Sequence, residues 1–160
     1  MQKKKACIQP LDLFADSDFQ SDQPEEKHLQ NISVESVPEY DHTALFQRLA
    51  QSEFRSHFHL KAKDRTYIDA KGLDTIQQHA ADFVAKRLAP AEIPNDGKQT
   101  PMRGHPVFLA QHATGCCCRG CFYKWHHILP GHTLTAQEQQ YAVSVLMTWI
   151  RKEYYNPKSR

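Results

Sequence analysis

The residues with the clearest chemical potential lie in one short stretch, HATGCCCRGCFYKWHH, at positions 112–127. It contains four of the chain's five cysteines and three of its ten histidines. Thiolate and imidazole are the ligands that zinc prefers, and structural zinc sites take closely spaced pairs of them. Cys118 and Cys121 form a Cys-x2-Cys pair, with His112 before it and His126 after it. This spacing predicts a zinc site held by these four residues.

Other ligand sets and other chemistries remain open for the same stretch. Cys117, His127 or His105 could each replace one of the four nominated ligands. An iron–sulfur cluster would need Cys116, Cys117, Cys118 and Cys121, although adjacent cysteines cannot easily serve one cluster. A thiol beside a histidine could instead act as a nucleophile. Finally, free cysteines are often simply buried in the core.

A polar loop before this stretch gathers a second set of reactive side chains. In NDGKQTPMRGHP, at 95–106, we single out Asp96, Lys98, Arg103 and His105 as candidate catalytic residues. Lys98 and Arg103 could bind phosphate, while Asp96 or His105 could move a proton or hold a metal. The alternative is that these side chains only attach the loop to the body of the protein by surface ion pairs.

The elements around these residues are expected to be helical. Apolar residues recur at three- and four-residue spacing, which is typical of amphipathic helices. The helical segments are 42–55, 72–90, 106–113 and 134–154, and 116–127 is expected to be a helix or a tight turn. No segment alternates with the period of two that strands show. The sequence predicts a mainly α fold, a small helical domain with a metal-stapled Cys/His cluster.

Charge divides the chain into two parts. Residues 1–41 carry four Lys and nine Asp or Glu, a net charge of −5, and residues 42–160 carry sixteen Lys or Arg and nine acids, a net charge of +7. We expect a disordered acidic arm over 1–41 and a helical domain over 42–155. A basic body with an acidic arm is a pattern seen in proteins that handle nucleic acids, and a solvated surface with a disordered tail is the alternative.

Hydropathy and cysteine usage indicate where the protein works. No apolar run approaches the ~20 residues of a membrane span, so no membrane partner is expected. An odd number of cysteines crowded into one stretch does not resemble a disulfide framework. A cytoplasmic location, where thiols stay reduced, is therefore expected.

The segment QPLDLF, at 9–14, resembles the linear motif by which bacterial replication and repair proteins dock on the sliding clamp. The resemblance implies that Leu13 and Phe14 fill an apolar pocket and that Gln9 forms hydrogen bonds nearby, with Leu11 part of the same peptide. Apolar residues on a disordered arm usually serve a partner. A nonspecific or intramolecular role is the alternative.

Longer stretches resemble a protein family. FRSHFHL, KGLDTIQQHAADFVAKRLAPA, NDGKQTPMRGHPVFLAQHAT and CCRGCFYKWHHI resemble a family of small bacterial proteins, the YneG-like proteins, catalogued only as a domain of unknown function. The resemblance covers residues 42–152 and implies a stand-alone cytosolic domain without supplying an activity. It also implies that five residues match family positions: Cys117, Cys118, Cys121, His112 and His126. Cys116 is an extra cysteine in this comparison.

Three functions follow as hypotheses. The first is a zinc-binding helical domain that acts by binding in DNA transactions, as a replication or repair accessory. The second is a metal-dependent hydrolase or nuclease that acts on nucleic acid or nucleotides through the 95–105 loop. The third is a thiol redox protein, which requires a cysteine of lowered pKa.

Overall fold

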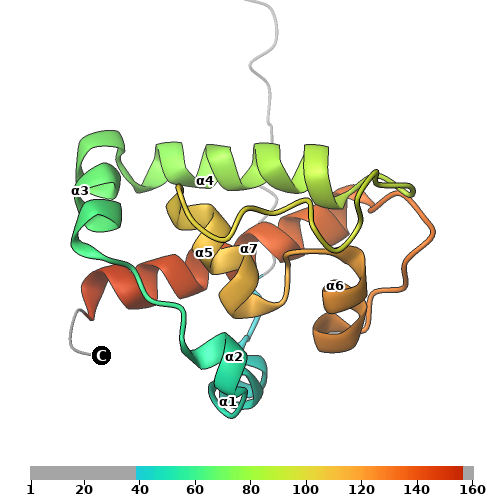
Figure 1. Ribbon diagram of the computed structural model, residues 1–160, viewed down its shortest axis with the longest axis horizontal. Helices are drawn as coiled ribbons and strands as arrows, with labels where there is room; N and C mark the ends of the chain where they lie inside the picture. Colours follow the sequence, from blue (N-terminus) through green and yellow to red (C-terminus); the bar gives the residue numbers. More distant parts are fainter. Residues whose placement is uncertain (1–38, 157–160) are drawn as a thin grey trace, which may run out of the picture. The chain divides into compact units, whose positions relative to one another are not determined.

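The computed structural model describes residues 39–156, and these residues form a helical domain without strands (Figure 1). The mainly α fold is therefore confirmed. The elements are α1 (Thr43–Ala50), α2 (Glu53–Ser56), α3 (Ala62–Lys71), α4 (Leu73–Phe83), the π-helix η1 (Val84–Leu88), α5 (Pro106–Thr114), α6 (Arg119–His126) and α7 (Ala136–Tyr155). The predicted clamp-binding peptide 9–14 lies outside the described residues, so it remains a prediction.

The core forms where α5 packs against α7 and where α4 packs on both of them. Figure 1 shows α5 running down from below α4 and crossing α7, with α3 at one end of α4 and α6 near the other end. The apolar stripe predicted along 72–90 supplies buried residues from α4 and η1, and α7 contributes the opposite wall. The buried residues of these two stripes are Ile76, Ala80, Val84, Leu88, Ala142, Val145, Leu146, Trp149 and Ile150.

Local sequence signals set several helix boundaries. Pro106 occupies the first turn of α5, where its missing N–H leaves no intrahelical bond unmade. Thr135 and Glu138 form a capping box at the start of α7. The segment 42–55 forms two helices and not one, because the side chain of Ser52 accepts the Arg55 N–H and starts α2 as a new helix.

Two features were not expected from the sequence. The helix α3 is polar on most of its surface, so it lacks the apolar stripe by which helices are recognised. The last turn of the α4 segment widens into η1, where the Ala89 N–H bonds the Val84 carbonyl at 2.8 Å.

Within residues 39–156, no helix is long and apolar enough to span a membrane.

Candidate metal centre

The corner between α5 and α6 brings the cysteines together. The helix α5 ends at Gly115, whose φ of 74° is in the left-handed region that favours glycine. The Trp125 ring packs against this residue, and a Cβ at position 115 would lie 2.6 Å from Trp125 Cδ1. The chain then reverses, and Cys118 caps α6 with its Sγ 3.4 Å from the Cys121 N–H nitrogen.

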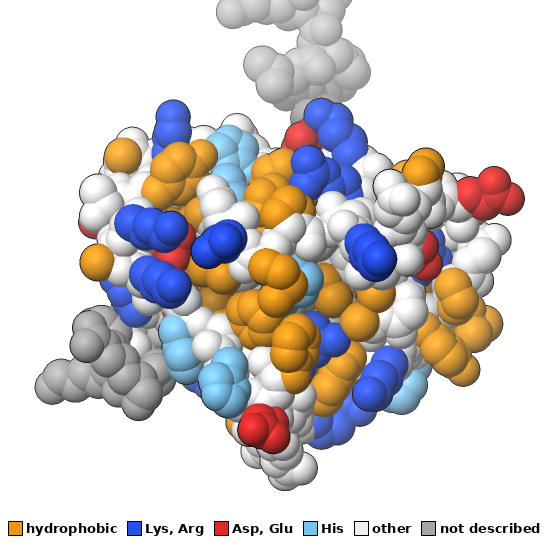
Figure 2. Space-filling model, in the orientation of Figure 1, with side chains coloured by type: hydrophobic (Ala, Val, Ile, Leu, Met, Phe, Trp, Pro, Cys, Tyr) orange, Lys and Arg blue, Asp and Glu red, His pale blue; other side chains and the backbone are white. Residues whose placement is uncertain are grey.

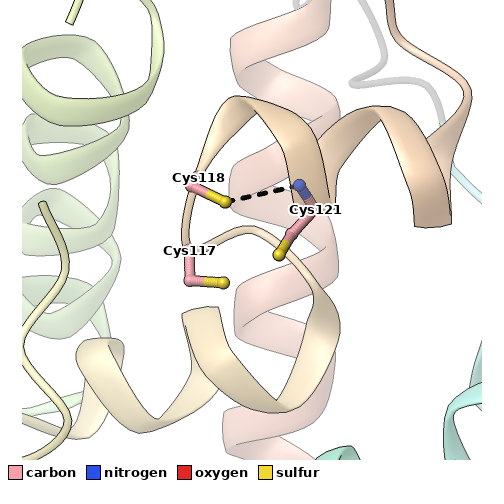
Figure 3. A group of neighbouring side chains, drawn as sticks. All are labelled: Cys117, Cys118 and Cys121. Carbon is pink, nitrogen blue, oxygen red and sulfur yellow. Dashed lines mark hydrogen bonds between the residues drawn. The ribbon is translucent and has the colours of Figure 1, made fainter. Parts of the chain in front are cut away.

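Three sulfurs converge at this corner. The Sγ atoms of Cys117, Cys118 and Cys121 all lie within 4.8 Å of one another, and Figure 3 shows them directed toward a common point. Cys117 and Cys118 are buried and Cys121 is half-buried. Thiolates bound to one zinc ion at ~2.3 Å in a tetrahedron lie about 3.8 Å apart. The three cysteines could therefore hold a metal ion.

A buried arginine from a distant helix contacts this group. Arg55, on α2, lies with its Nη2 3.2 Å from the Sγ of Cys121 and its Nη1 3.5 Å from the Sγ of Cys117. Its Nη1 also donates to the main-chain carbonyl of His112. Only 8% of Arg55 is exposed, so a fixed positive charge lies beside the sulfurs.

The three thiols differ in their tendency to ionise. A hydrogen bond from Cys121 lowers the pKa of Cys117 to about 7, and the Arg55 guanidinium acts in the same direction. The pKa of Cys121 is raised, mainly because this thiol donates to Cys117, and burial raises the pKa of Cys118. One thiolate is therefore accessible near neutral pH before any metal binds, and a metal would be needed to ionise all three.

Cys116 does not belong to the group of three. It is fully buried, and burial raises its pKa to about 12. Its Sγ lies 3.5 Å from Nε2 of His126, and it is not one of the three sulfurs that lie within 4.8 Å of one another. Cys116 is thus a core residue, in agreement with its being the extra cysteine of the sequence comparison.

His112 lies beside the group in a defined tautomer. Its Nε2 is 3.1 Å from each of the carbonyl oxygens of Thr100 and Pro101. A carbonyl only accepts, so Nε2 carries the proton and Nδ1 carries the lone pair. No residue within 39–156 forms a hydrogen bond with Nδ1, and the Phe58 ring stacks on the imidazole with centroids 5.5 Å apart. His112 is not among the groups whose ligand atoms lie within 4.8 Å of the sulfurs.

The other nominated histidines lie elsewhere. His126 Nε2 donates to the Thr114 carbonyl at 2.8 Å, and its Nδ1 accepts from the Tyr141 hydroxyl at 2.9 Å, so both ring nitrogens are engaged. Burial lowers the pKa of His126 to about 4. His127 is an exposed residue with φ 60° at the end of α6. Of the predicted ligands, the structure therefore groups Cys118 and Cys121 with the alternate Cys117.

The 95–105 loop contacts this corner, but its candidate catalytic residues do not converge. Asp96 Oδ1 accepts from the backbone N–H of Arg119, the residue after Cys118, at 3.3 Å. Lys98 and Arg103 are exposed. His105 begins α5, where its Nδ1 accepts the Val107 N–H at 3.0 Å and its Nε2 lies 3.0 Å from His79 Nδ1.

Sequence reasoning missed Arg55. The only local signal is a charged residue among Phe54, Phe58 and Leu60, which is unusual for a segment that packs on the core. Nothing in the sequence links that arginine to cysteines more than sixty positions away. The contact depends on α2 packing against α5.

Comparison with known proteins places the chain in a family without assigning an activity. No solved structure matches it. The family model described as "Domain of unknown function (DUF4186)" matches residues 43–151, which include every helix that carries the metal-centre residues. The uncharacterised family expected from the sequence is thus confirmed, and the chain belongs to the DUF4186 family.

Proposed function

We propose that the domain binds one zinc ion through the sulfurs of Cys117, Cys118 and Cys121 and the Nδ1 of His112. The observation that carries the proposal is the convergence of three sulfurs within 4.8 Å. Three thiolates and one imidazole are a common ligand set of structural zinc sites. The bound ion would connect the end of α5 to the start of α6.

The hydrogen bonds of His112 support its inclusion as the fourth ligand. Histidines that bind metals nearly always donate their second ring N–H to a carbonyl or carboxylate, which fixes the tautomer. His112 already has this arrangement toward Thr100 and Pro101. The two carbonyls belong to the 95–105 loop, so zinc would also fix that loop.

The basic surface supports a role in binding nucleic acid. The helical part of the chain, 43–155, carries fourteen Lys or Arg and nine Asp or Glu, a net charge of +5. Figure 2 shows Lys and Arg side chains distributed over one face of the molecule. Lys63 and Lys71 are exposed on α3, and Lys61, directly before this helix, is also exposed. We propose that the zinc-stapled domain contacts DNA phosphates in replication or repair, with the 9–14 peptide as its attachment to the sliding clamp.

Metal analysis of the purified full chain tests the zinc proposal. We expect one equivalent of zinc, lost in Cys118→Ser and Cys121→Ser and retained in Cys116→Ser. A wild-type protein that binds no zinc after reduction and reconstitution would refute it. If His112→Ala keeps its zinc at full affinity, the fourth position is open to water, which is the arrangement that the hydrolase alternative requires.

Titration of a fluorescent DNA duplex tests the nucleic-acid proposal separately. Affinity should fall steeply between 50 and 200 mM salt, on the scale of tenfold or more, because each phosphate contact releases counterions. Reversal of the charge at Lys61, Lys63 and Lys71 should weaken binding while zinc content stays at one equivalent. Absence of binding at low salt would contradict this part of the proposal alone.

Thiol redox chemistry is the second candidate. It is favoured by the Sγ atoms of Cys117 and Cys121, which lie within 4.8 Å of each other, and the lowered pKa of Cys117 is consistent with it. In this scheme the Cys117 thiolate attacks a substrate disulfide and releases one thiol. Cys121 then attacks the mixed disulfide, which releases the second thiol and leaves a disulfide in the protein. Zinc bound at one equivalent in freshly purified protein would argue against this candidate, because coordinated thiolates cannot also cycle.

A further inference from the structure

Arg55 is a buried cation whose ionisable partners are sulfurs. Its Nη2 lies 3.2 Å from Cys121 Sγ and its Nη1 3.5 Å from Cys117 Sγ. Among residues 39–156 it forms no ion pair with a carboxylate. Its remaining contacts are the His112 carbonyl and the Phe54 ring, whose centroid lies 4.9 Å from the guanidinium carbon.

A buried guanidinium requires compensating charge. Arginine stays protonated in proteins, and removing its charge from water costs several kcal/mol unless a partner restores the lost interactions. A carbonyl dipole and an aromatic face restore part of this free energy. Neutral thiols are weak acceptors and add little. Compensation would be complete if the adjoining sulfurs carried negative charge, as thiolates bound to a metal ion do.

We propose that Arg55 is the charge partner of the metal centre, a positioning residue that neutralises an anionic zinc–thiolate group and attaches α2 to it. The inference rests on the proposed zinc site. One divalent ion and three thiolates carry a net charge of minus one, and the guanidinium brings the buried group to zero. Two N–H groups of one planar guanidinium reach two different sulfurs, which a lysine ammonium on a flexible stem cannot reproduce.

The same charge balance specifies the fourth ligand. A neutral imidazole such as His112, or a water molecule, keeps the group neutral. Coordination by an anionic carboxylate, of which Asp96 is the nearest candidate in the loop, would leave one uncompensated negative charge at a buried site. Arg55 thus favours a site of three thiolates and one neutral ligand over a site with four anionic ligands.

The contact also links metal binding to the order of α2. This helix has four residues, far fewer than a helix needs to be stable alone, so tertiary contacts must hold it. Arg55 is its buried residue and the one that reaches the sulfurs. Loss of the metal would weaken that attachment, because no ion would then hold in place the two sulfurs that Arg55 contacts.

Zinc and cobalt titrations of the reduced, metal-free full chain test the inference. Cobalt reports thiolate coordination by its charge-transfer absorbance, and competition with a chelator gives the zinc dissociation constant. We expect Arg55→Met to weaken zinc binding about 10- to 100-fold, as is typical for partners of metal ligands, and Arg55→Lys to have an intermediate effect. Arg65→Met is the matched control, because Arg65 donates to the carbonyls of Glu153 and Tyr154 and contacts no sulfur.

Amide hydrogen exchange over α2 provides a second readout. Zinc should slow exchange at 53–58 in the wild-type protein and in Arg65→Met, and it should not do so in Arg55→Met. Should Arg55→Met fail to fold, Arg55→Lys carries the test, and wild-type zinc affinity in Arg55→Lys would overturn the inference. A wild-type chain that binds neither metal refutes the zinc proposal itself. A wild-type chain that binds zinc, with Arg55→Met equally tight, refutes the role of Arg55 alone.

Discussion

The two buried arginines of the described domain differ in the groups that they bind. Arg55 contacts two cysteine sulfurs, whereas Arg119 donates its hydrogen bonds to backbone carbonyls. The carbonyl partners of Arg119 belong to Leu88, Ala89, Pro90, Leu129 and His132. Arg119 therefore holds the fold whatever the state of the cysteines, while the contacts of Arg55 depend on the charge of the sulfurs.

The position of Arg119 explains why so many carbonyls converge on it. The last carbonyls of a helix have no intrahelical partner, and the helix dipole makes that end negative. Leu88–Pro90 form such an end, where η1 stops, and Arg119 brings the 129–132 segment to the same point. Arg119 and Cys118 are adjacent in sequence, so one short segment contributes to both the fold and the candidate site.

Replacement of Arg119 by Met should have the largest effect on stability. It would remove the donor of the buried Leu88 carbonyl and of the part-buried Pro90 and His132 carbonyls, while the Ala89 carbonyl keeps the Leu134 N–H. Each unsatisfied buried group costs about 1–3 kcal/mol, so we expect a loss of about 3 kcal/mol in total. Denaturant unfolding with zinc and with a chelator should show the same loss in both conditions. A loss confined to the zinc-bound protein would contradict the distinction between the two arginines.

Removal of the metal should destabilise the protein by a smaller amount. Zinc at 100 times its dissociation constant adds about 2.7 kcal/mol to the free energy of unfolding. Cys121→Ser should lose this increment and unfold like the chelated wild-type protein. Cys116→Ser, whose sulfur lies outside the group, should still gain stability when zinc is added. If Cys121→Ser responded to zinc as the wild-type protein does, the three-cysteine centre would be wrong.

The fold was predictable where amphipathic helices are long. The stripes of 72–90 and 134–154 each extend over several turns, so their apolar period identified both the helices and their buried residues. The α3 helix lacks an apolar stripe, and α2 is a single turn that starts only because Ser52 caps it. The π-helical widening of η1 left no trace in the spacing of apolar residues.

The candidate site was predictable only in its local part. Cys118 and Cys121 are close in space because they are three residues apart at a helix start, which the sequence encodes directly. The left-handed turn at Gly115 separates His112 and His126, although the two flank the cysteines symmetrically in the sequence. Arg55 lies on α2, more than sixty positions before the cysteines that it contacts. Such a contact cannot be predicted from local sequence, because it forms only when the helices pack together.

Gly115→Ala tests the turn between α5 and α6. The chain passes through this turn before it reaches both the three cysteines of the metal centre and Arg119. A left-handed conformation costs an L-residue about 1–2 kcal/mol, and the added Cβ would clash with Trp125, so we expect a loss of about 2 kcal/mol. Gly97→Ala is the matched control. Its φ is also positive, at 96°, but nothing lies within 4 Å of its Cβ position. Equal losses in the two variants would show that the Trp125 contact is unimportant.

Acidification should have the smallest effect on stability. It tests the surroundings of His105, which contain neither buried arginine. Burial, aided by the nearby His79, lowers the pKa of His105 to about 4 from its ordinary value of 6.5. The stability that the neutral imidazole contributes is therefore complete above pH 6.5 and is lost as the pH falls toward 4. Because His105 is only half-buried, we expect acidification to lower the free energy of unfolding by about 1 kcal/mol through this residue.

His105→Asn should remove this part of the pH dependence while still capping α5, since asparagine is a good N-cap that does not titrate. Unfolding measured in chelator between pH 7 and 4 checks it without a contribution from zinc release, and an unchanged pH profile in His105→Asn would contradict the assignment.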